Sequence, residues 1–170
     1  MILSEQTFIE LAGKQEVLDA KIKAANGVEK LPTDRIELYY YIELGECLNE
    51  LKGDFKHWSK KPMNREAFIE ELVDALHFYL SYANHFDKEM DGHLTINTVY
   101  KWVKEQYDSY KWDGADLWEM ARAALRQDIE RSFGILLAIA ERYDFTEQDI
   151  IDAYNKKNDT NHDRSDSGVY

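Results

Sequence analysis

Apolar residues recur at helical spacing through most of this chain, in runs separated by short polar stretches that hold both prolines. No stretch alternates apolar and polar residues over the length that a strand requires. The pattern therefore predicts an all-α fold, a helical bundle. The expected helices cover residues 4–26, 34–51, 64–85, 95–107, 115–143 and 146–157.

Local signals mark the ends of several of these helices. Gly27 follows the first helix and is a candidate C-cap. Asp34 and Glu37 have the spacing of a capping box at the start of the second helix, and Asn64 is a candidate N-cap of the third. Between the second and third helices, residues 53–63 have the composition of a loop.

The end of the chain differs in composition from the rest. Thr146 and Asp149 begin the last helix, which we expect to end near Lys157. The remaining residues, 158–170, are polar and carry no apolar stripe, so composition predicts a flexible tail. We therefore expect one domain over residues 1–157, followed by that tail.

Composition and charge narrow the functional classes. The chain has 170 residues, enough for one domain with a sizeable core, and a formal net charge of -12. This charge argues against non-specific binding of nucleic acid or an anionic membrane, so neither is an expected partner. Cys47 is the single cysteine, which excludes an intrachain disulfide and fits a reducing compartment. With no apolar leader or membrane span in the sequence, we expect a cytoplasmic protein.

Two pairs of acidic residues interrupt the apolar runs. Glu43 and Glu46 lie three residues apart, as do Glu71 and Asp74, so each couplet projects from one face of its helix. Carboxylates on an apolar face repel one another and lose hydration, and neither run contains a lysine or an arginine. A hard divalent cation such as Mg²⁺ would resolve the conflict. From spacing alone, a solvated helix face is an equally good interpretation.

A di-iron carboxylate bundle is a competing kind of metal site. It requires a Glu-x-x-His motif on each of two helices. Asp74 and His77 imitate one such motif with aspartate in place of glutamate, but the sequence contains no Glu-x-x-His. This alternative is therefore the weaker of the two metal sites.

Further segments around the couplets form a pattern with them. They are QEVLDAKI near the N-terminus, FKHWSKKP at residues 55–62, DALHFYLSYAN at residues 74–84 and AYNKKNDTNHDRSDSGVY at residues 153–170. With the two couplets, these segments make the chain resemble the dimeric all-α dUTPases of phages and some bacteria, within the all-α nucleoside triphosphate pyrophosphatases. Ile42 stands where MazG-like members of that superfamily often have a glutamate, which favours the dUTPase resemblance.

This resemblance implies an activity and a metal site. Members of the family hydrolyse dUTP to dUMP and pyrophosphate with two or three Mg²⁺ ions, for which Mn²⁺ can substitute. By resemblance, the metal ligands are Glu43, Glu46, Glu71 and Asp74. A carboxylate of the first couplet, Glu43 or Glu46, would also be catalytic by orienting or deprotonating the attacking water.

The resemblance also implies a set of substrate-binding residues. Lys157, Asn161 and Arg164 would bind the phosphates, with the tail closing over the nucleotide. The expected base and sugar contacts are Gln15, Trp58, His77, Tyr79 and Asn84. An amide such as Gln15 suits the imide edge of uracil, and an indole such as Trp58 offers a stacking surface. For His77 and Tyr79, ordinary core packing is an equally good interpretation.

Several partners and functions stay open at this point. The resemblance implies a homodimer. The aromatic segment over residues 100–118 could cover the active site, form the dimer surface or bind another protein, such as the repressors that some phage relatives bind. One alternative function is a related pyrophosphatase acting on dCTP or a modified nucleotide. Another is a non-catalytic acidic helical module that binds a regulator.

Overall fold

The computed structural model describes residues 1–89, 95–112 and 114–168. Over these residues the chain forms seven α-helices and one 3-10 turn, and no strand, which confirms the predicted all-α fold. None of the described helices is long and apolar enough to cross a membrane. The elements are α1 Glu5–Asn26, α2 Thr33–Glu50, η1 Lys52–Asp54, α3 Arg65–Glu89, α4 Ile96–Trp112, α5 Leu117–Ala124, α6 Ile129–Arg142 and α7 Glu147–Ser167.

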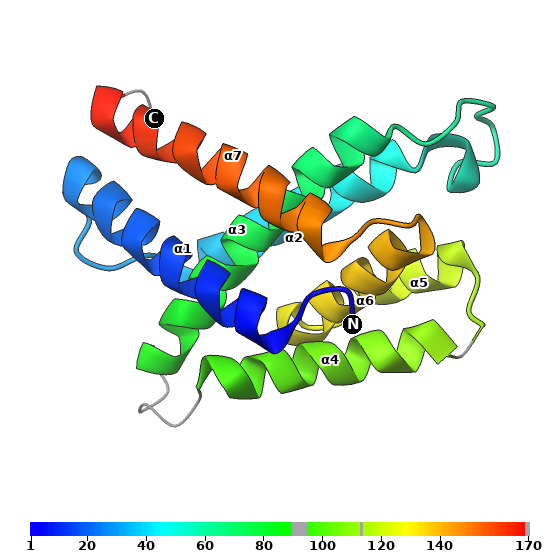
Figure 1. Ribbon diagram of the computed structural model, residues 1–170, viewed down its shortest axis with the longest axis horizontal. Helices are drawn as coiled ribbons and strands as arrows, with labels where there is room; N and C mark the ends of the chain where they lie inside the picture. Colours follow the sequence, from blue (N-terminus) through cyan, green and yellow to red (C-terminus); the bar gives the residue numbers. More distant parts are fainter. Residues whose placement is uncertain (90–94, 113, 169–170) are drawn as a thin grey trace.

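Helix α3 lies at the centre of the bundle. It packs beside α2, and the connection between the two closes where the Asn64 amide donates to the Glu50 carbonyl, 3.0 Å away. Figure 1 shows α1 and α7 side by side across this helical hairpin, while α4, α5 and α6 form a second group along one edge. Helix α3 contacts members of both groups, so it connects the two parts of the molecule.

The core is most apolar around α6. Every residue of this helix from Ser132 to Ala140 is buried. Its one buried hydroxyl is satisfied, because Ser132 Oγ lies 2.9 Å from the Tyr40 hydroxyl and donates to the Ala124 carbonyl at 2.7 Å. Helix α4 crosses α6 so closely that a Cβ atom on Gly134 would lie 2.3 Å from the Val103 carbonyl oxygen. Only glycine allows this approach.

Three of the four predicted helix caps are confirmed. Gly27 has a left-handed backbone conformation after α1, with φ of 64°. Asn64 Oδ1 accepts from the Ala67 amide at 3.3 Å, and Thr146 forms a complete capping box at the start of α7. The capping box predicted at Asp34 is wrong, because Pro32 precedes α2 and no side chain caps that helix.

The single helix predicted over residues 115–143 is also wrong, because the chain bends between Ala124 and Ile129. The bend lets two short amphipathic helices bury their separate apolar faces, with Ala121 on α5 and Ile129 on α6 both fully buried. The bond from Ser132 Oγ to the Ala124 carbonyl satisfies a group that the bend releases from its helical partner. The periodicity is continuous across this bend, so the sequence pattern alone did not show it.

The last helix is longer than predicted. Helix α7 continues past Lys157 to Ser167 and ends at Gly168, whose φ is 68°. Polar contacts with α1 hold this extension: Lys21 Nζ lies 2.7 Å from Asp166 Oδ2 and donates to the His162 carbonyl at 3.2 Å. Composition missed the extension because its packing surface is polar. The last two residues of the predicted tail, Val169 and Tyr170, lie outside the described residues.

Candidate active site

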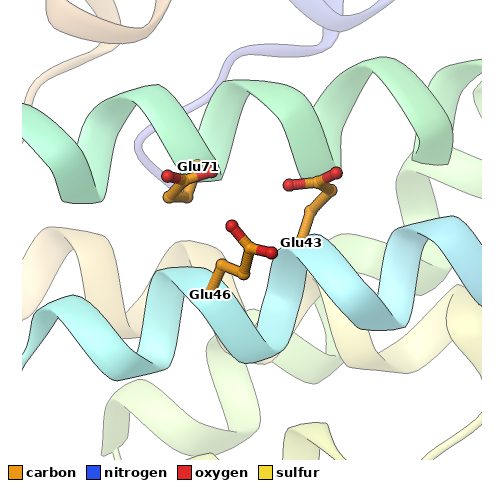
Figure 2. A group of neighbouring side chains, drawn as sticks. All are labelled: Glu43, Glu46 and Glu71. Atoms are coloured by element: carbon orange, nitrogen blue, oxygen red, sulfur yellow. The ribbon is translucent and has the colours of Figure 1, made fainter.

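Three of the predicted metal ligands meet between the hairpin helices. Glu43 and Glu46 project from α2 and Glu71 from α3, and Figure 2 shows their carboxylates in the space between the two helices. One oxygen of each carboxylate lies within 4.8 Å of the others. All of these donors are oxygens, the ligand type that hard cations such as Mg²⁺ and Mn²⁺ prefer. The arrangement fits a divalent cation.

The protonation of this cluster reflects its crowding. Burial, followed by the charges of Asp74, Glu46 and Glu71, raises the pKa of Glu43 to about 7. Burial and the neighbouring carboxylates also raise the pKa of Glu71. Without a cation, the cluster therefore favours a bound proton over full ionisation. A divalent ion would reverse that preference by supplying positive charge.

The fourth predicted ligand, Asp74, is paired with a cation of the protein itself. Asp74 Oδ2 lies 2.5 Å from Lys157 Nζ on α7, and Glu70 Oε1 lies 4.0 Å from the same nitrogen. Burial raises the pKa of the Asp74 carboxyl, while its hydrogen bond and ion pair with Lys157 act in the opposite direction. A predicted metal ligand and a predicted phosphate ligand are thus in direct contact.

A cavity of about 510 Å³ opens beside the carboxylates, bounded by α1, α2, α3 and α7. Its lining joins an apolar wall, which includes Leu18, Ile36 and Phe78, to a set of charged and polar groups. Of the residues predicted from the sequence, it brings together Gln15, Glu43, Asp74, His77, Lys157, Asn161 and Arg164. Glu43 belongs to both the carboxylate cluster and the cavity wall.

A buried polar network lies at the Gln15 side of this cavity. Gln15 Oε1 accepts from the Tyr154 hydroxyl at 3.1 Å and lies 2.6 Å from His77 Nδ1. Gln15 Nε2 donates to Asp19 Oδ1 at 2.7 Å, and Asp19 Oδ2 lies 3.2 Å from His85 Nε2. The His77 ring stacks on Tyr154 with centroids 4.2 Å apart. Burial, and then the charge of Lys157, lower the pKa of His77 to about 3, so the imidazole is neutral.

The sequence analysis missed Asp19, Tyr154 and His85 as members of this site. For Asp19 a signal was present, since it follows Gln15 by four residues and shares its face of α1. Tyr154 and His85 reach the network from other helices. Their contribution depends on tertiary packing, which spacing along the chain does not reveal.

Three predicted substrate residues do not line the cavity. The side chain of Tyr79 has 0% exposure and stacks on Phe133 with centroids 4.5 Å apart, so it is a core residue. Asn84 Nδ2 donates to the Ala12 carbonyl at 2.8 Å and thereby joins α3 to α1. Trp58 is 73% exposed in the loop between α2 and α3, where its ring meets His57 edge-on.

Fold and site together define a class. An all-α bundle carries three neighbouring carboxylates on a helical hairpin, and the adjoining cavity is lined by Lys157 and Arg164 of a separate helix, side chains of the type that bind phosphates. A family model described as dUTPase matches residues 7–169, so the chain belongs to the all-α dUTPase family and acts as a dUTP diphosphatase. No curated protein sequence matches the chain.

Proposed function

We propose that dUTP hydrolysis by this protein depends on Mg²⁺ held by Glu43, Glu46, Glu71 and Asp74. The observation that carries the proposal is the meeting of three carboxylate oxygens within 4.8 Å, one of them from Glu43 at the wall of the cavity of about 510 Å³. When bound, such ions neutralise phosphate charge and lower the pKa of water. Two or three ions per site, with Mn²⁺ as a substitute, remain predictions.

We assign the orientation of the attacking water to Glu43. Its carboxylate is the member of the cluster that also lines the cavity, so it is the nearest of the three to an entering phosphate chain. Glu46 is more exposed and does not line the cavity, which leaves it as a ligand. Water positioned by a carboxylate approaches phosphorus with its lone pair directed at the reacting atom.

Lys157, Asn161 and Arg164 would hold the phosphates. They lie four and three residues apart on α7, which brings all three to the cavity along one face of the helix. As the nucleotide enters, Lys157 would exchange Asp74 for a phosphate oxygen. The ion pair at 2.5 Å would then belong to the nucleotide-free protein. Arg164 adds a planar fork that can donate two hydrogen bonds to one phosphate.

The base would occupy the end of the cavity that holds Gln15 and His77. There the apolar wall offers Leu18 and Phe78 to the faces of a pyrimidine, while the buried amide offers polar recognition. Trp58 as a stacking residue stays a prediction, as do the homodimer, a repressor-type partner and the cytoplasmic location. Flexibility of residues 158–170 also stays a prediction. Because α7 extends to Ser167, this flexibility would be a movement of the end of that helix.

Pyrophosphate release tests the proposal. We expect rapid release from dUTP with Mg²⁺ or Mn²⁺, none in EDTA, and slower release from dCTP, dTTP and UTP. Glu66→Gln is a suitable control variant, because Glu66 is an exposed acid of α3 outside the carboxylate cluster. Turnover that persists in EDTA would contradict the metal assignment, and faster hydrolysis of dCTP would contradict the base.

A further inference from the structure

We propose that Asp19 is a positioning residue that sets the base specificity of the cavity by fixing the orientation of the Gln15 amide. The proposal rests on the proposed function of this site, since it concerns how the same cavity distinguishes uracil from cytosine. The observation behind it is the chain of contacts from His85 through Asp19 to Gln15 and on to His77.

The orientation of the amide follows from the chemistry of its partners. A carboxylate oxygen accepts hydrogen bonds, so the Gln15 atom 2.7 Å from Asp19 Oδ1 is the NH₂ group. The opposite orientation would bring two oxygens together at that distance, in a site where Asp19 is 4% exposed. His85 lies 3.2 Å from the second oxygen of Asp19 and holds the carboxylate in place.

Counting hydrogen-bond capacity then shows what Gln15 has left for a ligand. Its Oε1 has two lone pairs, which face His77 Nδ1 at 2.6 Å and the Tyr154 hydroxyl at 3.1 Å, whose one hydrogen is shared with the Leu11 carbonyl at 3.2 Å. Its Nε2 has two hydrogens, of which Asp19 takes one. The unused capacity of this cavity-lining side chain is a single N–H group. Gln15 therefore acts toward the base as a donor and not as an acceptor.

The same contacts fix the tautomer of His77. Because Gln15 Oε1 can only accept, the hydrogen in the contact at 2.6 Å is on His77 Nδ1. The imidazole is neutral, so its Nε2 carries no hydrogen, and this buried atom has no hydrogen-bond partner among the described residues. Asp19 thus controls the proton position on a ring that it does not touch.

This arrangement discriminates at position 4 of a pyrimidine. A donor from Gln15 pairs with the 4-carbonyl of uracil but opposes the 4-amino group of cytosine, which is also a donor. A site built to pair with one polar group rejects a ligand that leaves it unpaired. Asn in place of Asp19 keeps the shape but can present either an oxygen or an NH₂ group to Gln15. The amide could then turn over and accept from cytosine, while His77 moves its proton to Nε2.

The experiment combines a tautomer measurement with a specificity measurement. Nitrogen-15 NMR of the full-length protein without nucleotide reports which His77 nitrogen is protonated. The ratio of kcat/KM for dUTP to that for dCTP reports base choice. The variant is Asp19→Asn, and its matched control is Asp152→Asn, because Gln148 Nε2 donates to Asp152 Oδ1 at 2.8 Å with the same four-residue spacing on the exposed face of α7.

We expect the Nδ1–H tautomer in the wild-type protein and in Asp152→Asn, and a mixture of tautomers in Asp19→Asn. The ratio for dUTP over dCTP should fall about 10-fold or more in Asp19→Asn and stay unchanged in the control. An Nε2–H tautomer in the wild-type protein, or an unchanged ratio in Asp19→Asn, would overturn the proposal. If dUTP is not hydrolysed at all, the proposed function fails, whereas the tautomer still decides whether Asp19 fixes the amide.

Discussion

Helices α6 and α7 pack against the same bundle by opposite means. Between Ser132 and Ala140, α6 buries every residue among apolar neighbours. Beyond Tyr154, α7 buries only Asn158 and Ser165, and Asn158 Oδ1 and Ser165 Oγ have no hydrogen-bond partner among the described residues. Apolar burial stabilises, whereas a buried polar atom without a partner destabilises. Helix α6 is therefore held by apolar burial, whereas the end of α7 depends on polar contacts such as those of Lys21 with Asp166 and His162.

In the carboxylate cluster, we expect a substitution to cause a large loss of activity with no loss of stability. Glu46→Gln should lower kcat for dUTP on the order of 10³-fold or more, the loss expected for a group that acts on transition-state charge. In EDTA the same variant should be as stable as the wild-type protein or more stable, because one repelling charge is gone. Turnover and thermal unfolding should be measured on the same samples, with Glu66→Gln as control. Near wild-type kcat in Glu46→Gln would remove Glu46 from the metal site.

Substitutions in the two helices should differ in their effect on unfolding. Phe133→Ala removes a fully buried ring from α6 and should lower the free energy of unfolding by about 3–5 kcal/mol. Asn158→Ala removes an amide whose oxygen has no partner and should cost less than about 1 kcal/mol. Urea titrations followed by circular dichroism measure both. Equal losses would mean that the end of α7 carries as much stability as the core.

Arg164 tests whether the end of α7 contributes to activity without contributing to stability. Arg164→Ala should lower kcat/KM for dUTP by roughly 10-fold to 100-fold, because a charge-assisted contact to phosphate is lost. Its urea midpoint should hardly change, because the side chain is exposed in the free protein. Lys156→Ala is the control, since Lys156 does not line the cavity. If Arg164→Ala unfolds the protein and Lys156→Ala does not, this position of α7 is structural.

The metal-free protein should lose stability as the pH rises. Glu43 binds its proton more tightly in the folded protein, with a pKa of about 7 instead of 4.5, so folding takes up a proton between these values. The stabilisation is complete below about pH 4.5 and is lost as the pH rises through about 7. In EDTA, the melting temperature should therefore decline across this window, and less steeply in Glu43→Gln. A slope that is identical in wild type and Glu43→Gln would show that the proton is held elsewhere.

The local parts of this architecture were predictable from the sequence. Spacing of three residues within each couplet placed Glu43 with Glu46 and Glu71 with Asp74 on shared helix faces, and a helix preserves such spacing wherever it packs. The pattern of the chain also predicted the all-α fold. Helix caps with a side-chain donor or acceptor, such as Thr146, were equally readable.

The parts that depend on which faces meet were not predictable. Tyr79 and His77 are two residues apart on α3, yet one packs in the core and the other lines the cavity. The pairing of Asp74 with Lys157 joins helices that are distant in the chain, and no local pattern announces it. The polar packing of α7 against Lys21 likewise has no signature in composition.

Anomalous scattering from Mn²⁺ in crystals soaked with the ion and dUMP would test the metal site most directly. We predict anomalous peaks within about 2.0–2.3 Å of carboxylate oxygens of Glu43, Glu46 and Glu71, with Asp74 released from Lys157. The same crystals of Glu46→Gln should lose at least one peak. Peaks at other acidic residues, or an active enzyme whose crystals show no metal between α2 and α3, would contradict the assignment of these carboxylates as the metal centre.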